Sequence, residues 1–163
     1  MEMNDRNEDR ISSLLQEKWA EGFGLHVQGI VFAAGAFLPC EGKKARSGSG
    51  LVTAITFLGE SSVSSVLAEN NGAWVHLTEC DSIIPEGLNL RLSCGEGQMG
   101  NEGYVAVCAK NTNRLIWFAF FECSNPFSGL RFEEGVLIAE NSYEQEWGFP
   151  LNAPQDFWIR PIA

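Results

Sequence analysis

The stretch Arg114-Leu-Ile-Trp-Phe-Ala-Phe-Phe-Glu122 decides the fold, because it has the pattern of a strand that is apolar on both faces. Successive side chains of a strand point to opposite sides. One predicted face carries Ile116, Phe118 and Phe120, and the other carries Leu115, Trp117, Ala119 and Phe121. Both faces need cover, from a second sheet or from a packed helix. The stretch therefore predicts a mainly β protein, an antiparallel β-sandwich or open barrel of short strands.

An amphipathic N-terminal helix is predicted over about residues 5–21, where Asp5 can cap the first turn and Gly22 can end the helix. We expect its apolar stripe to cover the second face of strand 114–122. The alternative is that the stripe docks on a second copy of the chain and forms a homo-oligomer. With a β body over about 24–163, the whole chain, 1–163, is predicted to be one domain. The stripe consists of Ile11, Leu14, Leu15 and Trp19.

The body is predicted as short strands joined by turns. A basic, Gly/Ser-rich loop is expected over Glu41–Gly50. Asn71-Gly72 is a hairpin signal that would pair Val63–Glu69 with Ala73–Glu79. The alternative is a short helix that starts at Val63. Outside the meander described next, the predicted strands are Leu25–Ala33, Leu51–Leu58, Leu130–Phe132, Val136–Glu140, Glu146–Phe149 and Phe157–Ile162.

A three-stranded meander is predicted to end with strand 114–122. With Gly95–Glu102 as its first loop, Leu92 lies opposite Val105, and the next turn places Val107 opposite Ile116. A slip of one residue would move each strand's apolar set to the other face, so this register is specific. The shared apolar face is predicted to carry Leu90, Leu92, Val105, Val107, Ile116 and Phe118.

The chain is acidic, with 11 basic and 21 acidic residues and a net charge of −10. Residues 47–163 hold five of the basic and fourteen of the acidic residues. Such a surface repels nucleic acid and anionic membranes and favours a basic partner or a cationic ligand. The first ten residues lack the apolar core of a signal peptide, and five widely spaced cysteines predict free thiols, so we expect a cytoplasmic protein.

The motifs that could carry chemistry have weak local support. Gly95-Glu-Gly-Gln-Met-Gly100 matches a dinucleotide fingerprint, but a strand follows it where that fingerprint needs a helix, so we predict a hairpin loop. His26 and His76 are the two histidines, and neither lies in a spacing typical of metal ligands. We name no catalytic residue, no metal ligand and no cofactor, and leave the roles of both histidines open.

An acidic run near the C-terminus is the candidate partner-binding surface. Residues 132–146 contain five carboxylates and no basic residue, and two aromatic residues accompany them. Aromatic residues among charges are typical anchors of protein interfaces. The alternative is a solvated hairpin edge whose like charges discourage aggregation. The candidate site residues are Glu133, Glu134, Glu140, Tyr143, Glu144, Glu146 and Trp147.

These patterns favour a non-enzymatic interaction protein that binds a basic protein, in the manner of an immunity or inhibitor protein. In size and charge the chain is similar to small acidic β-rich proteins that neutralise basic toxins, and to orphan proteins carried on mobile gene cassettes. The alternative function is a small-molecule-binding β-barrel with an aromatic, acid-lined pocket for an apolar or cationic ligand. An enzyme ranks behind both.

Overall fold

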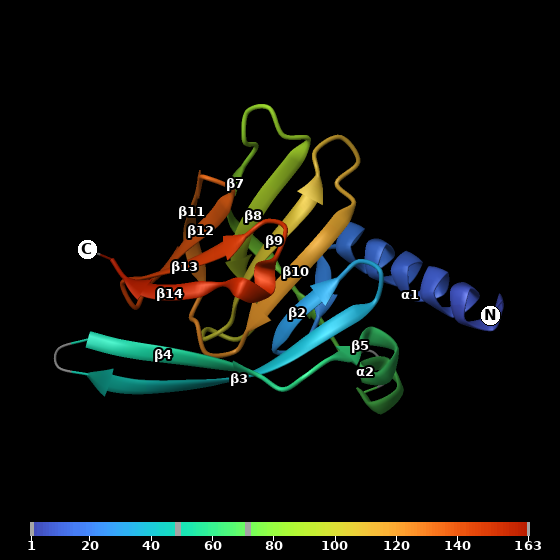
Figure 1. Cartoon of the computed structure of the whole chain (residues 1–163), viewed down its shortest axis with the longest axis horizontal. Helices are drawn as coiled ribbons and strands as arrows, with labels where there is room; N and C mark the ends of the chain where they lie inside the picture. Colours follow the sequence, from blue (N-terminus) through green and yellow to red (C-terminus); the bar gives the residue numbers. More distant parts are fainter. Residues whose placement is uncertain (1, 48–49, 71–72, 163) are drawn as a thin grey trace.

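The central strand β10, Leu115–Phe121, lies between two covering layers in the computed structural model, which describes residues 2–47, 50–70 and 73–162 (Figure 1). Phe118 and Phe120 belong to a core that also contains residues of helix α1, Glu2–Ala20. Trp117 and Phe121 belong to a second core, shared with a four-stranded sheet. The predicted two-sided burial of this strand is confirmed.

The larger sheet is antiparallel and has the order β4-β3-β2-β10-β9-β8-β7, with the short β5 paired to β3. The predicted strand Leu25–Ala33 is divided, because Phe23–Leu25 (β1) pairs instead with Trp74–His76 (β6). The remaining strands of the large sheet are β2 (Gly29–Phe32), β3 (Ala36–Ser47), β4 (Gly50–Phe57), β5 (Ser61–Ser62), β7 (Thr78–Ile83), β8 (Leu90–Glu96) and β9 (Gly103–Ala109).

The second sheet consists of β11 (Phe127–Glu133), β12 (Val136–Asn141), β13 (Gln145–Pro150) and β14 (Trp158–Pro161), with a short 3-10 helix, η1 (Pro154–Asp156), before β14. Its inner side chains, among them Leu137 and Phe149, pack on the face of β10 that carries Trp117 and Phe121. At one side the two sheets are joined where the Leu130 backbone N–H donates to Asp81 Oδ2 over 2.9 Å. The fold is therefore mainly β, an antiparallel β-sandwich with one N-terminal helix, as predicted.

The apolar stripe of α1 covers the other face of β10, which carries Phe118 and Phe120, as predicted. Ile11 and Leu15 are buried, and the Trp19 ring lies edge-on to Phe118, with centroids 6.2 Å apart. Gly22 ends the helix in the left-handed conformation (φ 89°), which favours glycine. The helix begins at Glu2, so Asp5 lies within the helix and the predicted cap there is wrong.

The meander keeps its predicted faces at the first hairpin but not its register. Leu92 lies opposite Val107, two positions from the predicted partner, because Gly95 and Glu96 continue strand β8 and shorten the loop. A shift of two residues preserves the face of every side chain, since side chains alternate with a period of two. The hairpin loop predicted for the glycine motif is confirmed, because strand β9 follows it.

The second hairpin of the meander contains a bulge that the sequence analysis did not predict. Pairing shifts by one residue between Leu115 and Trp117, so Trp117 lies opposite Val107 and Ile116 is 41% exposed. Gln16 of the helix accepts a hydrogen bond from the Leu115 N–H (2.8 Å) and donates one to its carbonyl (2.9 Å). The predicted face was therefore wrong at Ile116 and Phe118, because Leu115 still pairs with Cys108 and the bulge places one extra residue before Trp117.

Two further local predictions were wrong. Helix α2, Val63–Asn70, replaces the predicted hairpin strand, since Ser62 Oγ accepts the Ser65 N–H at its start and Val63 and Val66 are buried. Asn71 and Gly72 lie outside the described residues. The predicted loop Glu41–Gly50 is largely part of the paired strands β3 and β4, which extend beneath the second sheet as an arm (Figure 1).

Candidate functional site

The predicted interface anchor Trp147 lies in the core of the sandwich. Its exposed fraction is 0%, and its ring stacks on Phe157 with an interplanar angle of 5° and centroids 5.9 Å apart. Its indole N–H donates to Gln145 Oε1 at 3.2 Å. Trp147 cannot contact a partner without unfolding, so its assignment to a recognition surface was wrong.

Glu146 is also buried, at 8% exposure, and lies between two arginines. Its carboxylate oxygens accept from Arg131 Nη2 at 2.8 Å and from Arg160 Nε at 2.7 Å. Burial acts to raise the pKa of Glu146, but the hydrogen bonds from Arg160 and Arg131 outweigh it and hold that pKa below its ordinary value. Arg131 lies directly before the acidic run in the sequence and Arg160 fourteen residues after Glu146.

The other carboxylates of the run do not form one surface. Arg131 also binds Glu133 (3.0 Å) and Glu140 (3.2 Å), which are partly neutralised in this way. Glu134 lies in the turn between β11 and β12, and Glu144 lies in the turn at the other end of β12. The seven predicted residues are therefore divided among the core, the group of ion pairs around Arg131 and two separate turns.

Tyr143 is paired with a cation from the β3–β4 arm. Lys44 Nζ donates to Tyr143 Oη at 3.0 Å and lies 4.9 Å from the centre of its ring. The chain itself supplies the basic group that was expected from a partner. Arg131 lies one residue before the run 132–146, and Arg160 and Lys44 come from distant segments, so a charge count within 132–146 could not reveal them.

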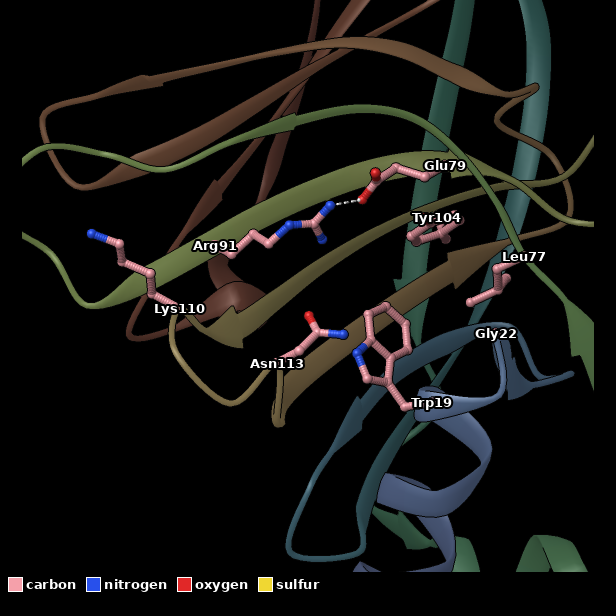
Figure 2. Close-up of a pocket in the computed structure, with 8 residues that line it drawn as sticks. All are labelled: Trp19, Gly22, Leu77, Glu79, Arg91, Tyr104, Lys110 and Asn113. Carbon is pink, nitrogen blue, oxygen red and sulfur yellow. Dashed lines mark hydrogen bonds and ion pairs between the residues drawn. The ribbon is translucent and has the colours of Figure 1, made fainter.

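A hollow of about 420 Å³ lies where the end of α1 meets strands β7, β8 and β9 (Figure 2). Trp19, Leu77 and Tyr104 provide its apolar wall, and the Trp19 and Tyr104 rings meet edge-on at 6.4 Å. Burial, followed by the charge of Glu79, raises the pKa of Tyr104 above its ordinary value. The volume falls in the range of small-molecule sites.

The polar side of this hollow is formed by hydrogen-bond donors. Arg91 is paired with Glu79, and in Figure 2 its guanidinium points toward the space that the Asn113 side chain and Trp19 also face. Lys110 lines the rim, with its ammonium pointing away from the hollow. The pocket therefore differs from the acid-lined pocket of the sequence analysis, because its carboxylate Glu79 is already bound to Arg91.

A second cluster joins His26, Glu102 and Glu122 just before the start of strand β9. His26 Nε2 lies 2.8 Å from Glu102 Oε2 and 3.8 Å from Glu122 Oε1. His26 follows β1, Glu102 precedes β9, and Glu122 follows β10. The three residues are too far apart in sequence for any local motif, and this is why the sequence analysis named His26 without partners.

Glu102 is held rigidly although it ends a surface loop. Its exposed fraction is 2%, and Oε1 accepts the Met99 backbone N–H at 2.9 Å. A Cβ atom at Gly97 would lie 2.6 Å from that oxygen, so only glycine fits there without displacing the carboxylate. The glycine motif that resembles a dinucleotide fingerprint thus leaves room for Glu102. His76 lies elsewhere, edge-on to Phe23.

Three of the cysteines have buried thiols. Burial, followed by the neighbouring Cys123, raises the pKa of Cys40 to about 12, and burial raises the pKa of Cys108 to about 12. Burial likewise raises the pKa of Cys94. Because the thiolate is the reactive form, these thiols are poor nucleophiles and poor metal ligands in the folded chain.

Comparisons of the chain with protein-family models, with curated proteins and with solved structures give no match. Within the part of the chain that the structure describes, no helix is both long enough and apolar enough to cross a membrane. The function must therefore be inferred from the geometry of the sites themselves.

Proposed function

We propose that the protein binds a small planar molecule in the hollow formed by Trp19, Tyr104 and Arg91, and that this ligand carries hydrogen-bond-accepting groups along one edge. The observation that supports the proposal is the opposition of an aromatic wall to donor groups in one concave space of about 420 Å³. Ligand pockets typically combine a large apolar surface with a few directed polar groups.

Donor groups determine the chemistry of this ligand. A guanidinium has five N–H donors, and the ion pair with Glu79 engages Nη2, so other donors of Arg91 can serve a ligand. The Asn113 amide adds two donors and one acceptor. A carbonyl, carboxylate or sulfonate edge fits such a set, while the ring of the ligand would contact Trp19 and Tyr104.

Anilinonaphthalene sulfonate is a suitable probe, because it is planar, carries a sulfonate and fluoresces in an apolar site. We expect saturable binding to the wild type. Asn113→Gly should weaken it about fivefold to tenfold, the equivalent of one lost hydrogen bond. Glycine keeps the backbone unstrained, because Asn113 has φ 54°.

Asn125→Gly is the matched control, since Asn125 also has positive φ (59°) but does not line the hollow. It should leave probe affinity unchanged. Arg91→Lys, which keeps the charge but loses the planar donor set, should also weaken binding. Absence of saturable binding, or equal losses in Asn113→Gly and Asn125→Gly, would contradict the proposal.

Binding of a basic protein is the second candidate, and the net charge of −10 favours it. Its surface would use the exposed carboxylates Glu134 and Glu144 rather than Trp147. With a lysine-rich peptide as probe, association should slow as salt rises, because exposed charges are screened beyond about 8–10 Å near 0.1 M salt. An association rate that is independent of salt would exclude this candidate.

A further inference from the structure

We propose that His26, Glu102 and Glu122 form a binding site for one divalent transition-metal ion, with Zn²⁺ as the occupant. This inference is independent of the ligand pocket, because the two sites share no residue. The observation behind it is that the three side chains offer ligand atoms that all lie within 4.8 Å of one another.

The spacing of these atoms suits a shared ion. Zinc binds imidazole nitrogen and carboxylate oxygen at about 2.0–2.2 Å, so two ligands of a tetrahedral ion lie roughly 3.3 Å apart. The His26–Glu102 and His26–Glu122 separations, 2.8 and 3.8 Å, bracket that value. The Glu122 side chain is 52% exposed, so it can move closer to the other two ligands when an ion binds.

Two of the three ligands are held in place before an ion binds. Glu102 is fixed by the Met99 N–H and by the space left at Gly97. The His26 ring lies edge-on to the buried Phe120, with centroids 5.6 Å apart, and its backbone N–H donates to Ala73 at 2.9 Å. A site with fixed ligands loses less conformational entropy when it binds an ion.

The third ligand also has an anchored backbone. The Glu122 N–H donates to Gln28 Oε1 at 3.0 Å, and its carbonyl accepts from Asn101 Nδ2 at 2.8 Å. The backbone of Glu122 is therefore hydrogen-bonded to Gln28, two residues from His26, and to Asn101, the neighbour of Glu102. The carboxylate of Glu122 points toward His26 from a backbone whose position is determined.

The charges of the cluster favour a cation. Two carboxylates face one imidazole, so the group has a net negative charge whether His26 is neutral or protonated. Glu102 is buried, and a buried carboxylate is costly unless a positive charge compensates it. A protonated His26 would place one positive charge between two carboxylates, whereas a divalent ion supplies two and uses all three groups as ligands.

The donor set selects the type of ion. One imidazole with two carboxylates suits Zn²⁺ better than Mg²⁺, which prefers oxygen ligands in an octahedral arrangement. Three protein ligands also leave a fourth position of a tetrahedral ion for water. Because His26 is 39% exposed, that position can face solvent.

Isothermal titration of the full chain with ZnCl₂, in buffer that contains excess Mg²⁺, tests the site. We expect one Zn²⁺ per chain, and at least tenfold weaker binding for His26→Gln and for Glu122→Gln. His76→Gln and Cys80→Ser are the matched controls, since they remove the other imidazole and the exposed thiol. Both controls should keep the wild-type affinity.

Glu102→Gln should also weaken binding, and circular dichroism shows whether this buried variant folds. If it does not fold, the half-exposed Glu122→Gln decides the question. The proposal is overturned if the wild type shows no saturable binding of Zn²⁺, if His26→Gln and Glu122→Gln both retain wild-type affinity, or if either control loses the site.

Discussion

Two buried carboxylates in this molecule have opposite surroundings. Glu146, 8% exposed, lies between Arg131 and Arg160, so two cations surround one anion. Glu102, 2% exposed, lies beside the His26 imidazole, which Glu122 also approaches. Two carboxylates therefore face one imidazole, and no arginine or lysine among the described residues belongs to this cluster. Glu146 is therefore balanced by permanently charged arginines, whereas Glu102 has one imidazole that it shares with Glu122. A buried carboxylate that shares its one imidazole with a second carboxylate is a better indication of a site than an acidic run in the sequence.

The contrast also explains why the acidic run is not one recognition surface. The run holds five carboxylates in fifteen residues. However, Arg131 and Arg160 both bind Glu146, and Arg131 also contacts Glu133 and Glu140. The His26 cluster contains only two carboxylates, in segments that look unremarkable. Local charge density therefore measures composition, while the balance of charge depends on which strands become neighbours.

The largest expected effect concerns the sheet that carries the balanced cluster. Trp147→Ala should reduce the free energy of unfolding by about 3–5 kcal/mol, because a fully buried aromatic side chain is removed from the core. Chemical denaturation measures this. Trp158→Ala is the control on the outer face of the same sheet, where Trp158 is only half-buried, and it should cost less than half as much. A loss below about 1 kcal/mol for Trp147→Ala would show that the ring is not core.

A smaller effect is expected at Glu146 itself. Glu146→Gln should destabilise the fold by about 1–3 kcal/mol at pH 7, through loss of charge-assisted hydrogen bonds. The folded-state pKa of Glu146 is lowered, so its contribution is present above the unfolded value of about 4.3 and is lost as pH falls through the folded value. The difference between wild type and variant should therefore shrink toward pH 3.

Denaturation curves at pH 7 and pH 3 test this dependence. The exposed Glu134→Gln should change stability at neither pH, and serves as the control. A wild-type to Glu146→Gln difference that is equal at pH 7 and pH 3 would contradict the stated role of the two arginines.

The smallest effect is expected at the cluster of His26, Glu102 and Glu122. Without added metal, Glu122→Gln should leave the free energy of unfolding within about 0.5 kcal/mol of wild type, because the Glu122 side chain is 52% exposed and its contact with His26 is long, at 3.8 Å. Chemical denaturation in the presence of a chelator measures this value. A loss as large as that of Glu146→Gln would mean that both clusters are structural ion-pair networks, and the contrast between them would fail.

Much of the sandwich followed from local patterns, because alternation along β10 and the spacing of Ile11 and Leu15 depend only on nearby residues. Errors arose where a distant group decided the outcome. Gln16 of the helix hydrogen-bonds both backbone groups of Leu115, directly before the residue at which the pairing with β9 shifts by one. No periodicity within the strand reveals a partner on a helix about a hundred residues away.

The candidate sites were less predictable than the fold for the same reason. His26 and Glu102 are separated by 76 positions and meet because β1 and the β8–β9 loop lie side by side. The hollow likewise combines the end of α1 with strands β7, β8 and β9. Trp19 was assigned to the core stripe, and its second role as a pocket wall depends on where that stripe ends.

The most direct test of the contrast is anomalous X-ray scattering at the zinc edge, from crystals of the full chain grown with Zn²⁺. We predict one strong anomalous peak about 2.0–2.2 Å from His26 Nε2 and from a carboxylate oxygen of both Glu102 and Glu122. We predict no peak at Glu146, where Arg131 and Arg160 already occupy the carboxylate. A peak at Glu146, or a cluster of His26, Glu102 and Glu122 that remains empty at saturating Zn²⁺, would contradict the account.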